Sequence, residues 1–451
     1  MRETSTPTPR VIDVQAFINA HKLAAVQITL LGLCFLIVAI DGFDTAAIGF
    51  IAPAIRADWG LTPAQLAPLF GSGLFGLMIG AFTIGPFADR HGRKAVLIFC
   101  VLFFGMASLA SAFSPNITVL ILLRFLTGLG LGGAMPNAIT LTSEYCPEQR
   151  RSFLTTVMFC GFTIGSALGG IVASQIVADY GWHSVLIVGG VLPLALAPVL
   201  WRALPESVRY LVMRQGETDR IVAVLQRIAP EADLRGAAFT GARKPHGSPV
   251  RQLFEGDLLR GTLLLWLAFF MSLLVVYLLS SWLPTLISSA GVSLREASLI
   301  TAMFQVGGTV GAITIGLLMD KANPHHVLAI AYATAGIFIY LIGHAASLPW
   351  LMVPAVFGAG FCVSGSQVGA NALSAAYYPT ASRATGVSWA NGVGRIGSVL
   401  GSMLGGVMLT LGWGLPTVFA IVAVPAVIAG LAIFVMGRVR ARALGRLQLQ
   451  A

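Results

Sequence analysis

The sequence predicts an all-α polytopic membrane protein, in which twelve membrane-spanning helices form two six-helix bundles. Of the 451 residues, 56% are hydrophobic and only 10% are charged, whereas soluble proteins carry about 25% charged residues. Apolar runs long enough to cross a bilayer recur along the chain, because a spanning helix needs about 20 such residues. Short motifs of the first half also return in the second half.

The apolar runs divide the chain into five regions. Residues 1–22 are polar and lack the apolar core and small-residue cleavage site of a signal peptide, so we expect a retained cytoplasmic segment. We then expect an N-terminal bundle at 23–203, a cytoplasmic linker at 204–259, a C-terminal bundle at 260–437 and a cytoplasmic tail at 438–451. The individual spans are predicted at 26–53, 64–88, 95–113, 117–145, 152–178, 183–203, 260–289, 295–319, 326–347, 350–378, 384–411 and 414–437.

The linker contains one further pattern. Ile221, Val224, Leu225 and Ile228 recur at helical spacing, which predicts a short amphipathic helix against the cytoplasmic face.

Charge predicts the orientation of the spans. If both termini are cytoplasmic, only two of the 28 basic residues lie on the outer side of the membrane, Arg56 and Arg295. Two more lie within the membrane, Arg124 and Arg395, and the rest are cytoplasmic. This bias follows the positive-inside rule. It accounts for the net charge of +10 without a nucleic-acid partner.

The halves share aligned motifs. Tyr145-Cys-Pro-Glu-Gln-Arg-Arg151 and the following Gly165-Ser166-Ala-Leu-Gly169 align without gaps with Tyr377-Tyr-Pro-Thr-Ala-Ser-Arg383 and Gly397-Ser398-Val-Leu-Gly401. Parallel repeats of six spans indicate two related bundles that rock against each other around a site near the bilayer midplane.

Two carboxylates lie inside the first apolar run, in Asp41-Gly42-Phe43-Asp44. An acid in the bilayer costs several kcal/mol unless it faces a cavity or a partner, and a spacing of three residues puts both acids on one helix face. We therefore predict proton coupling through Asp41 and Asp44, with Glu144 as the next candidate. Arg124 lies at a similar depth in its own span, which makes it their predicted partner.

Two motifs resemble signatures of the major facilitator superfamily. Gly85-xxx-Asp89-Arg90-His91-Gly92-Arg93-Lys94 is similar to its loop signature, and Arg124-xxx-Gly128-x-Gly130-x-Gly132 is similar to its fourth-span signature. The resemblance implies the major facilitator fold and a gate at the cytoplasmic ends of the helices, in which Asp89 pairs with Arg93. The gating residues predicted from both halves are Asp89, Arg90, Gly92, Arg93, Asp320, Lys321 and Arg383.

A closer resemblance is to the aromatic acid:proton symporter family. It rests on Asp41-Gly-Phe-Asp44-Thr-Ala-Ala-Ile-Gly-Phe-Ile-Ala-Pro53 and on Arg124-Phe-Leu-Thr-Gly-Leu-Gly-Leu-Gly-Gly-Ala-Met-Pro-Asn137, and it covers nearly the whole chain. It implies a monomeric transporter in the bacterial inner membrane. Such a protein imports hydroxybenzoate-like carboxylates with protons by alternating access and needs no cofactor.

An aromatic carboxylate needs a cation for its head, flat surfaces for its ring and hydrogen-bond partners for ring hydroxyls. We expect Arg395, which has no acid at matching depth in its half, to bind the carboxylate. The predicted substrate-binding residues are Arg124, Arg395, Phe43, Tyr277, Trp389, Asn137, Gln305, Gln367, Asn371 and Asn391.

Other function classes fit the residues less well. The chain has no HExxH motif, no GxSxG triad context and no Cys/His cluster, which disfavours a membrane enzyme or a metal site. Proton-coupled efflux by an antiporter of the same fold stays open. Gly161-xxx-Gly165-Ser166-xx-Gly169-Gly170 resembles the antiporter signature, but it has serine where that signature has proline, which favours uptake.

Overall fold

The structure, a computed structural model, describes residues 11–214, 217–234, 236–240, 249–254, 258–345, 349–379 and 382–450. Nearly all of these residues are helical, and twelve of the helices are long and apolar enough to cross a membrane. This confirms the predicted fold class. The twelve helices are α2 (Ala25–Trp59), α3 (Pro63–His91), α4 (Arg93–Ser111), α5 (Ile117–Tyr145), α6 (Glu148–Tyr180), α7 (His183–Ala203), α11 (Leu258–Ser289), α12 (Leu294–Lys321), α13 (Pro324–His344), α14 (Pro349–Tyr377), α15 (Arg383–Thr410) and α16 (Leu415–Gln450).

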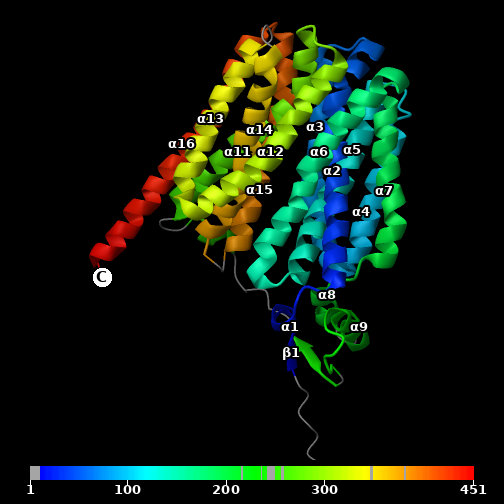
Figure 1. Ribbon diagram of the computed structural model, residues 1–451, viewed down its shortest axis with the longest axis vertical. Coiled ribbons are helices and arrows are strands. Elements are labelled where there is room, and N and C mark those ends of the chain that lie inside the picture. Colours follow the sequence, from blue (N-terminus) through cyan, green and yellow to red (C-terminus); the bar gives the residue numbers. More distant parts are fainter. Residues whose placement is uncertain are drawn as a thin grey trace, which may run out of the picture.

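The two halves use the same helix pairing, as the sequence repeat predicts. In the N-terminal half α2 packs on α6, α3 on α5 and α4 on α7, and in the C-terminal half α11 packs on α15, α12 on α14 and α13 on α16. Figure 1 shows the resulting pair of bundles side by side. Between the halves, α3 contacts α15 and α6 contacts α12, so the cross-half contacts are themselves related by the repeat.

Glycines at equivalent positions bring these helix pairs close together. Gly165 of α6 faces the backbone of Ala39 in α2, and Gly397 of α15 faces the backbone of Phe270 in α11. A Cβ atom at Gly165 would lie only 2.8 Å from the Cα atom of Ala39. Small residues are favoured at such crossings because lipid provides no hydrophobic force to bring helices together, and close packing has to do so.

Short elements cap one end of the bundle, which we call the linker end. They are β1 (Val11–Asp13), α1 (Val14–Ala20), α8 (Val208–Met213), α9 (Thr218–Ile228), β2 (Ala238–Thr240) and α10 (Pro249–Gln252). In Figure 1, β1, α1, α8 and α9 lie together below the N-terminal half. α9 is the predicted amphipathic helix, and it buries Ile221, Leu225 and Ile228. The parallel pairing of β1 with β2 was not predicted, because three-residue strands carry too little pattern to be recognised.

The halves meet closely towards the end opposite the linker. Gly49 of α2 lies against the backbone of Ser280 in α11, and the rings of Phe70 and Trp282 are 4.9 Å apart. Both contacts cross from one half to the other, and Phe70 and Trp282 belong to one continuous apolar cluster. The bundle is therefore packed shut on this side of the cavity described below.

The Gly165 crossing is testable because a methyl group there has no room. Replacing Gly165 with Ala should lower the melting temperature in detergent by roughly 5 °C, since overpacking against a rigid backbone costs about 1–3 kcal/mol. Gly32→Ala is the matched control, because nothing lies within 4 Å of a Cβ atom at that exposed glycine. Equal melting temperatures for the two variants would contradict the close crossing.

Candidate functional site

A cavity of about 140 Å³ lies between the two halves. Its volume is close to the roughly 150 Å³ of an engineered cavity that admits benzene, so an aromatic ring is a fitting occupant. Its walls are mostly apolar, with a few polar groups that converge from both halves. They include Asp44, Leu74, Leu77, Arg124, Leu131, Met135, Phe159, Phe162, Leu273, Tyr277, Ser280, Gln305, Gln367, Asn371, Asn391 and Arg395.

Asp44 and Arg124 form a fully buried ion pair in the N-terminal wall. Arg124 Nη1 lies 3.0 Å from Asp44 Oδ2, and Ser108 donates to the other carboxylate oxygen at 2.5 Å. The rest of the guanidinium donates to Ser111 Oγ at 3.2–3.3 Å and to Thr127 Oγ1 at 2.9 Å. Arg124 therefore has the acidic partner that its depth in the sequence predicts.

Asp41 has a different environment, although it lies one turn from Asp44. Its side chain is buried, and Oδ1 accepts a hydrogen bond from Thr45 at 3.1 Å. Oδ2 is buried with no partner among the described residues. Asp41 also makes no ion pair with any of the described residues. Of the two acids, Asp44 is therefore the one held in a direct ion pair, and Asp41 is not.

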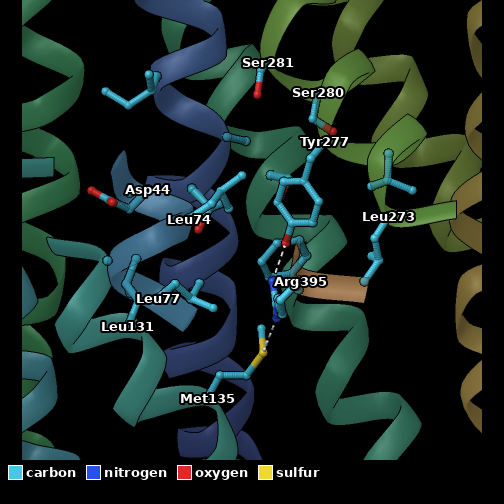
Figure 2. A pocket seen from close by; sticks show the side chains of 18 of the residues that line it. Asp44, Leu74, Leu77, Leu131, Met135, Leu273, Tyr277, Ser280, Ser281 and Arg395 are labelled. Atoms are coloured by element: carbon cyan, nitrogen blue, oxygen red, sulfur yellow. Dashed lines mark hydrogen bonds between the residues drawn. The ribbon is translucent and has the colours of Figure 1, made fainter. Parts of the chain in front are cut away.

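Arg395 approaches the cavity from the opposite wall. Its Nη1 donates to the Tyr277 hydroxyl at 2.9 Å, and Nη2 lies 3.9 Å from the Met135 sulfur, across the interface between the halves. Figure 2 shows the guanidinium between these two side chains. Within the described chain it makes no ion pair. A half-buried cation without an anion faces the space that a ligand would occupy.

Amides gather on the C-terminal wall beside Arg395. Asn391 donates to Asn371 Oδ1 at 3.1 Å, and Gln305 donates to Ser280 Oγ at 3.2 Å. The side-chain oxygen and nitrogen of Gln367 are both buried without a partner in the described structure. Gln367 lies one turn from Asn371 on α14, and Arg395 lies one turn from Asn391 on α15. The two helices run antiparallel, so Gln367 and Arg395 lie at similar depth.

Three predicted substrate residues are not in the cavity wall. Phe43 is buried between helices and packs near Gly169 and Gly189. Asn137 points back to its own helix and donates to Gly133 O at 2.7 Å. Trp389 is 46% exposed and stacks on Trp266, on the outside of the bundle. These residue types could bind an aromatic acid, but the rotation of each helix about its axis turns the three side chains away from the cavity.

The sequence prediction missed wall residues that lie on the Arg124 face of α5. Leu131 and Met135 follow Arg124 at seven and eleven residues, which is the helical repeat of one face. That periodicity was available from the sequence. It does not by itself indicate a binding site, because leucine and methionine carry no ligand chemistry of their own.

Glu144 lies at the linker end and not beside Asp41 and Asp44. It occupies the last turn of α5, where Oε1 is 3.1 Å from Arg93 Nη2 and Oε2 accepts from Ser207 at 2.6 Å. Glu206 caps the start of α4 nearby by accepting from the backbone N–H groups of Arg93 and Lys94 at 2.9 and 3.0 Å. The structure therefore places Glu144 beside the predicted gate residue Arg93 and away from Asp41 and Asp44, and its role in proton coupling stays a prediction.

The other predicted gate residues also lie at helix ends. Gly92 joins α3 to α4 with φ of 95°, a backbone conformation that favours glycine. The side chain of Asp89 lies outside the described part of the structure. Arg90, Asp320, Lys321 and Arg383 are exposed, and Arg383 donates to Tyr378 O at 3.4 Å.

The comparisons with known proteins agree with this architecture. The Major Facilitator Superfamily profile matches residues 34–291 and 265–448. This chain belongs to the major facilitator superfamily. Among its relatives, a gallate transporter of Pseudomonas putida is 48% identical over 97% of this chain and 98% of its own length. The 4-hydroxybenzoate transporter PcaK of Pseudomonas aeruginosa is 47% identical over 97% of this chain and 99% of its own.

These matches put the chain in the aromatic acid transporter family of the superfamily, so it is a transporter and not an enzyme. Solved structures show the same fold. The inward-open xylose transporter XylE from E. coli has a TM-score of 0.71 at 18% identity, covering 90% of this chain and 95% of that one. The members of this superfamily are multi-pass membrane proteins, in agreement with the twelve apolar helices.

The Asp44–Arg124 pair leads to a prediction about stability. Asp44→Asn should destabilise the protein by about 3 kcal/mol, because it leaves a buried guanidinium without its counter-charge. Adding Arg124→Gln should restore part of this loss. Melting temperatures of the two single variants and the double variant provide the measurement. If the two losses were simply additive, the pair would not be coupled as the geometry requires.

Proposed function

We propose that the protein imports a hydroxylated aromatic carboxylate together with protons, as a monomer in the bacterial inner membrane. The observation that carries this proposal is Arg395, an arginine without an acidic partner at the wall of a ring-sized, mostly apolar cavity. The names of the relatives support the same substrate class, since one is a gallate transporter and another is a 4-hydroxybenzoate transporter. One chain suffices, because both halves of the cavity come from it.

In this proposal the substrate carboxylate binds the guanidinium of Arg395. Two parallel N–H···O bonds give a planar carboxylate both affinity and orientation. The ring then lies among the apolar walls, against Leu74 from one half and Leu273 and Tyr277 from the other. Ring hydroxyls meet the amides at the same wall, where Gln367 has unused hydrogen-bonding capacity. Binding a hydroxyl there would relieve the cost of the unpaired amide.

We assign the transported proton to Asp41. Asp44 is paired with Arg124 and accepts a hydrogen bond from Ser108, so protonating it would break a buried ion pair. Asp41 has no such pair to lose and lies one turn away on the same helix. Protonation of Asp41 would therefore change the charge of the N-terminal half at little structural cost. That change provides a coupling between the proton and the motion of the halves.

Alternating access follows from the two packed halves in this proposal. The positive-inside bias supports a cytoplasmic linker end, and the close contacts at Gly49 and around Trp282 then close the outer side. The gate residues Asp89, Arg90, Gly92, Arg93, Asp320, Lys321 and Arg383 lie at the inner ends of the helices. We propose that ion pairs among them form when the inner side closes, which would stabilise the outward-facing state.

Transport by membrane vesicles tests the function directly. Right-side-out vesicles should accumulate labelled 4-hydroxybenzoate or gallate when an inward proton gradient is imposed, and a protonophore should collapse the accumulation. Benzoate and an aliphatic carboxylate should be tested in the same assay. Extrusion from loaded vesicles without uptake would instead favour the efflux antiporter. Transport of neither aromatic acid would contradict the proposed substrate class.

Arg395→Lys should raise the KM for the transported benzoate by about tenfold or more while uptake stays proton-dependent. Lysine keeps the charge but loses the planar fork that matches a carboxylate. Initial rates over a range of substrate concentrations measure the effect. Arg209→Lys at an exposed site on α8 serves as the control. An unchanged KM in the Arg395 variant would remove this residue from the carboxylate site.

Asp41→Asn should abolish accumulation against a gradient and retain exchange of labelled for unlabelled substrate. The amide resembles a protonated carboxyl group, so it permits the loaded transition but cannot release a proton. Counterflow and gradient-driven uptake in the same vesicles separate the two activities. The control is Asp219→Asn, at an exposed position of α9. Normal accumulation by the Asp41 variant would assign the coupled proton to another residue.

A further inference from the structure

A second hollow lies on the outside of the C-terminal half, between α13 and α16. It is an open groove of about 510 Å³, and the side chains along it are aliphatic except for Tyr340. Its floor is formed by small residues, including Ala333 and Gly336 of α13. Large exposed aliphatic side chains form its rims, such as Ile337 at 61% and Leu431 at 58% exposure. A groove of this depth and polarity on a membrane-facing surface fits a hydrocarbon chain.

Beyond the groove, the same face of α16 leads to a cluster of nitrogen-bearing side chains, Arg438 and His326, near the linker end. Val424, Val427, Leu431, Phe434 and Arg438 follow one another at alternating spacings of three and four, so they share one face of α16. The guanidinium of Arg438 lies over the Phe434 ring, 4.7 Å from its centroid. The His326 ring of α13 lies 6.0 Å from the same Phe434 ring. Two exposed nitrogen-bearing groups thus flank one aromatic ring at the mouth of the groove.

The near part of the groove lies within one leaflet's thickness of Arg438. At about 1.5 Å per residue, Leu431 lies about 10 Å and Val424 about 21 Å from Arg438 along the helix. Half of the hydrocarbon core measures about 15 Å. With Arg438 at headgroup level, the part of the groove around Leu431 lies among the acyl chains of the same leaflet, and one phospholipid can reach both.

We propose that this site binds a phospholipid with an anionic headgroup, whose phosphate lies between Arg438 and His326 and whose acyl chain follows the α13/α16 groove. Arg438 makes no ion pair with any carboxylate in the described part of the chain, so its charge is available. Charge complementarity selects the headgroup, because a zwitterionic lipid brings its own cation to this cluster. The site is separate from the central cavity, with which it shares no residue.

The test compares phosphatidylglycerol with phosphatidylcholine of the same acyl chains. Purified full-length protein in detergent is incubated with each lipid, and bound lipid is counted by native mass spectrometry. The wild-type protein should retain phosphatidylglycerol about tenfold better. Arg438→Gln should remove most of this preference and Arg438→Lys should keep it, since a basic residue near the lipid surface is worth about a fivefold change in binding.

Two variants separate the groove from the headgroup site. Ala333→Phe, at an exposed position on the groove floor, should reduce retention of both lipids by filling the space for the chain. The controls are Arg209→Gln at the linker end of the other half and Ile313→Phe on the exposed face of α12. Equal retention of the two lipids by the wild-type protein would overturn the proposal. It would also fail if the control variants lost as much bound lipid as the Arg438 and Ala333 variants.

Discussion

A charge inside a membrane needs an opposite charge, water or a ligand, and this requirement organises the centre of the protein. For Arg124 and Asp44 in the N-terminal half the requirement is met within the protein. Arg124 and Asp44 form a buried pair, and three hydroxyl groups complete their hydrogen bonds. In the C-terminal half Arg395 makes no ion pair within the described residues, and its hydrogen bonds there go to a tyrosine hydroxyl and a thioether. The repeated halves are therefore similar in packing and different in charge.

In the proposed mechanism this asymmetry separates two tasks, which are binding the substrate and carrying the proton. The Asp44–Arg124 ion pair gives the first half a rigid polar core. Asp41 lies next to this pair, and its protonation would break no ion pair. The uncompensated arginine of the second half supplies a binding charge. In that mechanism the substrate binds at the cavity wall and the proton binds beside the buried pair, and each can bias the same rearrangement of the two halves.

Close helix packing makes such a rearrangement a motion of whole bundles. Within each half, glycines such as Gly165 and Gly397 let backbones touch, and these contacts resist internal deformation. At the linker end, Glu206 and Glu144 tie the start of α4 to the end of α5 and to the linker. The N-terminal half is thus braced as one body, while its contacts with the C-terminal half lie towards the opposite end.

The sequence by itself determined the class of fold, the repeat, the amphipathic α9 and the pairing of Arg124 with an acid at its depth. These features depend on local hydrophobicity, on helical spacing and on the high cost of charge in lipid. All three can be judged from the order of residues in the sequence. The tertiary structure decided which acid Arg124 takes and where Glu144 lies. It also decided that Phe43, Asn137 and Trp389 point away from the cavity. Those outcomes depend on the rotation of each helix about its axis, which is determined by packing between helices that are distant in the sequence.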